Sequence, residues 1–198
     1  MALPTIERQE TGVTWPEQGR WTYDDWLRLP GDEFRYEIVE GELHVSPSPS
    51  YEHQNAIAEL LTQMRQYARR HNLGAVVTAP MGVRLPERDT AVQPDILFVA
   101  RDRLAIIRDD IIDGAPDLVV EVLSPSNWIY DRTRKQKAYE RAGVREYWIV
   151  DYRARTVDVL ALEGGEFVQR GQYHDGDTVP SEVLPGLSIS VADIFFKG

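Results

Sequence analysis

Two carboxylates stand inside segments that are otherwise apolar: Asp95 in Gln93–Val99 and Glu121 in Leu118–Leu123. A buried charge without a partner costs several kcal/mol or becomes neutral, so each of these carboxylates needs a metal ion, a lysine or both beside it. A Lys-rich stretch follows Glu121 in the sequence. Two carboxylates, a divalent ion and a lysine are the minimum set for metal-assisted hydrolysis, which is the chemistry that this pattern predicts.

A third acidic residue, Asp117, follows Pro116 and competes with Asp95 as the partner of Glu121. Asp117 and Glu121 would share one face of one strand, but four residues at ~3.3 Å each place them ~13 Å apart. A single ion cannot bind both, because its carboxylate oxygens must lie within ~2.0–2.6 Å. Asp95 belongs to a neighbouring strand and can come close enough. We therefore interpret Asp117 as a residue that starts a strand.

Two lysines in the segment 131–142 differ in their position around the predicted helix. At about 100° per residue, Lys135 lies in the middle of an apolar stripe that includes Tyr139, whereas Lys137 lies about 200° away on the solvent side. A lysine on a buried face needs an acidic partner, and Glu121 is the nearest carboxylate by topology. The alternative is a side chain whose stem lies on the core while its ammonium reaches water.

Further candidates for the site are His53 and Glu42. His53 falls on the apolar stripe of the predicted helix 51–72, in its first turn, where it could reach a cleft; a lone histidine there is also commonly a structural residue or a cap. Glu42 follows a predicted turn at Glu40-Gly41, and any of Glu37, Glu40 and Glu42 is a candidate additional metal ligand. Most such acidic residues are simply solvated.

The elements around these residues alternate between helices and strands. The best helical pattern covers residues 51–72, where one stripe at a period of 3.6 contains Ile57, Leu60, Leu61, Met64 and Ala68. A short helix is expected at 22–27, a hairpin at 36–45 and a second helix at 131–142. Strands are expected at 75–78, 82–85, 95–99, 118–123 and 146–150, with a peripheral sheet from 156–162, 166–170 and 187–190. This order predicts an α/β fold, a mixed β-sheet flanked by helices with additional peripheral strands.

Length and composition are those of one domain. The chain has 198 residues, of which 42% are hydrophobic and 27% charged, and we expect a flexible leader at 1–20 followed by a single domain at 21–198. There is no cysteine, so a metal must be held by oxygen or imidazole ligands. No segment reads as a signal peptide or membrane span, so we expect a cytoplasmic protein that does not use a membrane.

The net charge of −10 argues against a protein that coats nucleic acid nonspecifically, because such binding depends on Lys and Arg displacing counterions. It does not exclude a nuclease, because the local charge decides how a site meets phosphate. Six cationic residues lie within 132–145, although an ordinary solvated helix face would also account for most of them.

Several segments together resemble the Uma2 family of endonucleases, within the PD-(D/E)XK nuclease superfamily. The resemblance covers roughly residues 22–195 and is specific because the segments occur in combination. They are Tyr36–Leu43, Gln93–Val99, Gly114–Ser126, Lys135 with Tyr139, and Ala142–Asp151. One departure from the superfamily pattern is that Leu123 stands where a lysine is expected, two residues after the glutamate. The family pattern supports a lysine moved to position 135, four residues before Tyr139.

The resemblance implies a restriction-endonuclease-like fold in which Asp95 and Glu121 hold one or two Mg²⁺ ions and Lys135 assists. Mn²⁺ is an alternative metal, and Tyr139 joins Glu42 and His53 as an additional candidate. The implied activity is Mg²⁺-dependent hydrolysis of DNA phosphodiester bonds. The alternatives are a catalytically silent module that binds nucleic acid or protein, and a hydrolase of a smaller phosphodiester. A homodimer would place two such sites on opposite DNA strands.

Overall fold

A six-stranded mixed sheet forms the centre of the fold in the computed structural model, which describes residues 15–86, 89–124 and 131–196. The strand order is β11-β10-β9-β8-β6-β3; β8 and β9 run parallel, and the other neighbours are antiparallel. The predicted mixed sheet is therefore confirmed. Its strands are β3 (Gly74–Thr78), β6 (Ile96–Ala100), β8 (Leu118–Val122), β9 (Glu146–Asp151), β10 (Thr156–Glu163) and β11 (Glu166–Tyr173).

A second sheet has five short strands in the order β2-β1-β5-β4-β7, and a third has two. β1 and β2 form the predicted hairpin, whose turn residues Glu40 and Gly41 both have positive φ, as a tight hairpin turn requires. The strands of these sheets are β1 (Arg35–Val39), β2 (Glu42–Ser46), β4 (Gly82–Leu85), β5 (Thr90–Val92), β7 (Ile111–Asp113), β12 (Thr178–Pro180) and β13 (Ser188–Ser190).

The predicted peripheral sheet is partly wrong. β10 and β11 do not form a separate sheet but extend the central one, because β10 pairs with β9 from Thr156 to Ala161. Only β13 belongs to a separate sheet, where it pairs with β12. The additional strands that lie outside the central sheet come mainly from the N-terminal half of the chain.

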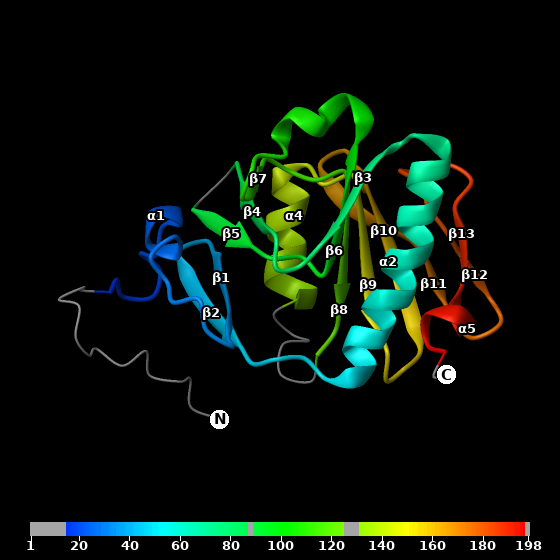
Figure 1. The fold of residues 1–198 in the computed structure, drawn as a ribbon, viewed down its shortest axis with the longest axis horizontal. Coiled ribbons are helices and arrows are strands. Elements are labelled where there is room, and N and C mark those ends of the chain that lie inside the picture. The colour runs from blue at the N-terminus through cyan, green and yellow to red at the C-terminus, as the bar shows by residue number, and fades with distance from the viewer. Residues whose placement is uncertain (1–14, 87–88, 125–130, 197–198) are drawn as a thin grey trace.

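The central sheet is covered on both faces. α2 and α5 pack on one face, while α4 and the five-stranded sheet cover the other. Figure 1 shows β1 and β2 at the opposite end of the molecule from β12 and β13. Among the described residues, the helices are α1 (Tyr23–Trp26), α2 (Tyr51–His71), η1 (Arg101–Ile106), η2 (Asp131–Lys135), α4 (Gln136–Ala142) and α5 (Val191–Ile194).

Strand alternation decides which face each side chain meets. Ile96 and Val120 face α2, whereas Leu97 and Val119 face α4 and the second sheet. By the same alternation, Glu121 belongs to the α4 face of the sheet. The carboxylate is therefore directed toward the layer that contains the Lys-rich helix.

The N-terminal segment joins the fold before residue 21. Residues 1–14 of the predicted leader lie outside the described residues, but Gln18 exchanges hydrogen bonds with the backbone of Leu43 at 2.7 and 3.0 Å. Trp15 stacks on Trp21, beside the second sheet. Within the described residues, no helix is long and apolar enough to cross a membrane.

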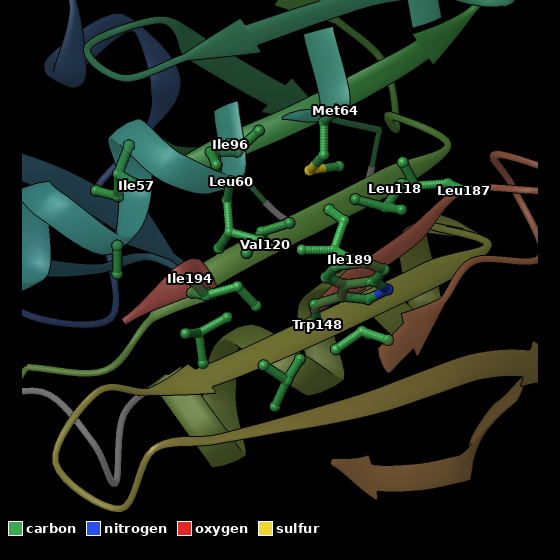
Figure 2. Packing of buried hydrophobic residues seen from close by; sticks show 14 of the residues in the cluster. Ile57, Leu60, Met64, Ile96, Leu118, Val120, Trp148, Leu187, Ile189 and Ile194 are labelled. Atoms are coloured by element: carbon green, nitrogen blue, oxygen red, sulfur yellow. The ribbon is translucent and has the colours of Figure 1, made fainter. Parts of the chain in front are cut away.

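α2 has the predicted extent but a slightly different buried stripe. Its N-cap Ser50 accepts a hydrogen bond from the backbone N–H of His53, and its C-cap Asn72 adopts the left-handed conformation. Figure 2 shows Leu60 and Met64 directed at the sheet that carries Ile96 and Val120. Leu61 is only half-buried at the edge of this cluster, so the stripe is centred on Leu60.

We expect Leu60→Ala to lower the free energy of unfolding by ~2–5 kcal/mol, because Leu60 is fully buried and its removal leaves a cavity. Leu61→Ala is the matched control and should cost distinctly less. Urea unfolding of both variants measures the difference. Equal losses would show that the packing under α2 is misassigned.

The second predicted helix, 131–142, begins with a π-helical turn. Asp131–Lys135 has this geometry and Gln136–Ala142 is α-helical, ending at Gly143 in the left-handed conformation. Lys135 stands at the junction, 1% exposed, whereas Lys137 is exposed. The predicted difference between the two lysines is confirmed.

Candidate functional site

Asp95 and Glu121 are brought together by the pairing of β6 with β8. Ile96 lies opposite Val120 in this antiparallel pair, so the next positions along, Asp95 and Glu121, are cross-strand neighbours on the same face. Asp95 directly precedes β6 and Glu121 is inside β8. Both are 2% exposed. Two buried carboxylates side by side require compensating charge.

Asp95 is held by three donors from three elements. Its Oδ2 accepts a 2.8 Å hydrogen bond from the backbone N–H of Val122 and lies 3.4 Å from His53 Nε2. Its Oδ1 accepts a 2.7 Å bond from Arg35 Nη1. Burial alone would raise the pKa of Asp95, but Arg35 and His53 outweigh it and hold that pKa well below its usual value. Asp95 is therefore a carboxylate in the folded protein.

Glu121 meets the helical layer. One oxygen, Oε1, accepts a 2.8 Å hydrogen bond from Lys135 Nζ and a 2.6 Å bond from the hydroxyl of Tyr139. Burial and the neighbouring charge of Glu121 raise the pKa of Tyr139 well above its usual value, so this hydroxyl remains a donor. Lys135 and Tyr139 together fix the orientation of the carboxylate.

Glu37, on β1, completes the cluster from the second sheet. Its Oε1 lies 2.9 Å from Lys135 Nζ and accepts a 2.7 Å hydrogen bond from the backbone N–H of Gln93. Burial would raise the pKa of Glu37, but the charges of Lys135 and then Arg35 lower it below its usual value. Lys135 therefore lies between one carboxylate of each sheet.

Arg35, also on β1, is the second cation of the cluster. Its Nη2 lies 3.6 Å from Glu37 Oε1 and 3.8 Å from Glu121 Oε2, in addition to the bond from Nη1 to Asp95. Burial would lower the pKa of Arg35, but the three carboxylates raise it well above its usual value. Among the described residues, three carboxylates stand against one arginine and one lysine in this cluster.

The donor set suits a hard divalent ion. Mg²⁺ prefers oxygen ligands and is commonly held by one or two carboxylates while it keeps several waters. Asp95 and Glu121 can supply that pair, since a single guanidinium already contacts both of them. Among the described residues, no group of three or more His, Asp or Glu side chains is placed so that it could hold a metal ion. A metal here would thus rely on these two carboxylates, both of which Arg35 contacts in this structure.

The cluster lies in a cleft of about 1000 Å³. One wall is the segment Ser46–Ser50 between β2 and α2, and another includes Thr78–Pro80. Arg153 and Arg155, from the turn between β9 and β10, also line it. A volume of this size is typical of clefts that bind small ligands.

The structure places the other candidates as follows. His53 reaches the cluster from the first turn of α2, and its buried Nδ1 has no hydrogen-bond partner among the described residues. Glu42 is not part of the cluster: it is 38% exposed and pairs with Arg134 at the surface. Asp117 accepts a 2.8 Å bond from the backbone N–H of Ala100 and a 2.8 Å bond from Arg103, so it anchors the start of β8.

Sequence reasoning missed Arg35 and gave Glu37 no preference over Glu40 and Glu42. A signal was available in the alternation of β1, where Tyr36 and Ile38 join one apolar cluster while Val39 joins the cluster under α4. Arg35 and Glu37 share the face of Val39 and therefore meet the central sheet. Polar residues on that inward face predict a site.

The lowered pKa values of Asp95 and Glu37 make the stability of the fold depend on pH. A carboxylate whose pKa is lower in the folded than in the unfolded protein stabilises the fold above the unfolded value, about 4, and this contribution is lost as the pH falls through the folded pKa. We expect the Tm in metal-free buffer to fall from about pH 5 downward, and Asp95→Asn to make that fall shallower. Thermal unfolding followed by circular dichroism at a series of pH values checks this. Parallel curves for the two proteins would contradict it.

Comparisons with known proteins agree with this fold. A solved structure described as "a putative nuclease belonging to DUF820" from Anabaena variabilis ATCC 29413 aligns with a TM-score of 0.72 and 21% sequence identity, covering 88% of this chain and 97% of that chain. No curated protein matches the sequence. The sequence model of the Uma2 family, described as "Putative restriction endonuclease", matches residues 23–192, which include every member of the buried cluster. That match extends over most of the chain, and the protein belongs to the Uma2 family.

Proposed function

We propose that this protein is a Mg²⁺-dependent endonuclease that hydrolyses DNA phosphodiester bonds. The observation that carries the proposal is the pair of buried cross-strand carboxylates, Asp95 and Glu121, with Lys135 beside them in an open cleft. The family description and the solved relative both name a nuclease, which supports the same class of reaction.

The chain's own residues have separate tasks in this reaction. Asp95 and Glu121 would hold the ion. The backbone N–H of Val122 keeps Asp95 oriented, and Tyr139 does the same for Glu121. When bound, Mg²⁺ supplies polarisation of the scissile phosphate and a water of lowered pKa.

Lys135 orients the attacking water or stabilises negative charge that develops on the phosphate. Its ammonium already lies 2.8 Å from Glu121 and 2.9 Å from Glu37, at the meeting point of the two sheets. The electrostatic interactions of this buried ammonium are stronger than they would be in water, because the surrounding dielectric constant is low.

The charges that line the cleft favour a metal-dependent enzyme over a module that binds nucleic acid without a metal. Among the described residues that line it, five are acidic and four are arginine or lysine. A divalent ion held by Asp95 and Glu121 would offset the negative charge that these carboxylates present to a phosphate backbone. The acidic residues are Glu33, Glu37, Glu52, Asp95 and Glu121, and the basic ones are Arg35, Lys135, Arg153 and Arg155.

A substrate panel tests the proposal. The protein is incubated with supercoiled plasmid, single-stranded DNA and small phosphodiesters, each with Mg²⁺, with Mn²⁺ and with EDTA. We expect the plasmid to be nicked or linearised with either metal and to stay intact in EDTA. Turnover confined to small phosphodiesters would reassign the substrate, and DNA binding without cleavage would support a silent binding module. A homodimer and a cytoplasmic location stay predictions from the sequence.

A further inference from the structure

Arg35 differs from the other cation of the cluster in how weakly it is held. Its guanidinium makes one short contact, the 2.7 Å bond to Asp95, while its other carboxylate contacts are 3.6 and 3.8 Å long. Nε and Nη2 are buried but have no hydrogen-bond partner among the described residues. A buried donor without a partner costs free energy, so this arrangement of Arg35 is under-satisfied.

Lys135 shows the opposite pattern. Its side chain is 1% exposed and makes contacts of 2.8 and 2.9 Å, whereas the side chain of Arg35 is 24% exposed and lines the cleft. If a metal ion displaces one of the two cations, Arg35 can move by rotating its side chain into the cleft. Lys135 is too deeply buried to do the same.

We infer that Arg35 is an exchangeable counter-ion, which occupies the position between Asp95 and Glu121 until a divalent ion displaces it, and which then turns into the cleft to bind the substrate phosphate. The inference rests on the proposed function and adds a positioning and phosphate-binding residue to it. A divalent ion compensates the two carboxylates more fully than one guanidinium charge does. The released guanidinium offers a planar pair of donors that matches two phosphate oxygens.

The charge of Arg35 also explains how the protein can fold with this buried acidic cluster when no metal is bound. Without Arg35, the described residues of the cluster would comprise three carboxylates and only one lysine or arginine, Lys135. Like charges at this distance raise one another's pKa and oppose folding. Arg35 therefore supplies positive charge beside Asp95 and Glu121 until an ion takes its place.

The first test is the affinity for Mg²⁺, measured from the rise of Tm with Mg²⁺ concentration in wild type, Arg35→Gln and Arg153→Gln. Arg35→Gln should lower the Tm without metal but bind Mg²⁺ about tenfold more tightly or better, because no charge-assisted hydrogen bond then competes. Arg153→Gln removes a charge that lines the same cleft and should leave the affinity within about twofold of wild type. Unchanged or weaker affinity in Arg35→Gln would overturn the inference, as would equal gains in both variants.

The second test observes the side chain directly. The ¹⁵N-labelled protein is titrated with Mg²⁺, and the Nε–H signal of Arg35 is assigned by its loss in Arg35→Lys. A saturable shift of this signal at the same Mg²⁺ concentrations as the Tm rise supports displacement, and a stationary signal rejects it. If neither wild type nor Arg35→Gln binds Mg²⁺ or Mn²⁺, the proposed function fails as well; if both bind equally, only the role of Arg35 fails.

Discussion

Replacing Lys135 by alanine is expected to lower kcat for DNA cleavage by ~10²–10³-fold while DNA affinity stays nearly unchanged. The ammonium lies within 3 Å of carboxylates from both sheets and is 1% exposed, so it acts on the reacting centre rather than on the DNA backbone at large. Lys137→Ala is the matched control, because Lys137 is two residues away on the exposed side of the helix. Its kcat should hardly change.

The same substitution removes one partner of a buried ion pair, which typically costs ~3–5 kcal/mol of stability. The kinetic comparison therefore belongs at a temperature where circular dichroism shows both variants folded. Equal losses from Lys135→Ala and Lys137→Ala, confined to salt-sensitive DNA binding, would show instead that the helix is an electrostatic surface.

Mg²⁺ is expected to raise the Tm of the wild-type protein, and Asp95→Asn is expected to remove that rise. An ion that binds only the folded state stabilises it by about 2.7 kcal/mol at 100 times its Kd, which for a chain of this size is about 5–11 °C. Asparagine can still accept the hydrogen bond from Val122 N–H but lacks the charge that attracts the ion.

Asp117→Asn is the control for this experiment. Asp117 is also fully buried and paired with an arginine, Arg103, but it anchors the start of β8. We expect it to lower the Tm without metal and to leave the Mg²⁺-induced rise in place. A Mg²⁺-induced rise that survives in Asp95→Asn would show that the metal does not bind at Asp95. A rise that disappears in both variants would show that its loss is not specific to Asp95.

Asp95, Glu121 and Lys135 could be identified from the sequence because each is a charged residue among apolar neighbours. Asp95 and Glu121 are charges within apolar strands, and Lys135 stands on the apolar side of its helix, so burial alone implies that they meet partners. The register of β6 with β8 then makes the first two neighbours. The contact of Glu121 with Lys135 follows from local patterns and chain order.

Arg35 and Glu37 could not be placed in the same way. The alternation of β1 places both residues on the face of Val39, but which layer that face meets depends on how the five-stranded sheet packs on the central one. That packing is set by long-range contacts. For the same reason, the alternation of β10 and β11 identifies strands but not the sheet that they join. Glu42 looked equivalent to Glu37 in sequence, yet it lies on the other strand of the hairpin and pairs with Arg134 at the surface.

The measurement that tests the central claim most directly is the single-turnover rate of cleavage of one end-labelled DNA by wild type and by Asp95→Ala. Both proteins are used in excess over the DNA, across a series of Mg²⁺ concentrations and in EDTA, after circular dichroism has shown that both are folded. We expect a wild-type rate that rises with Mg²⁺ to saturation and vanishes in EDTA, and no cleavage by Asp95→Ala at any Mg²⁺ concentration. Cleavage by Asp95→Ala at the wild-type rate, or wild-type cleavage that persists in EDTA, would contradict a metal-dependent nuclease site at Asp95 and Glu121.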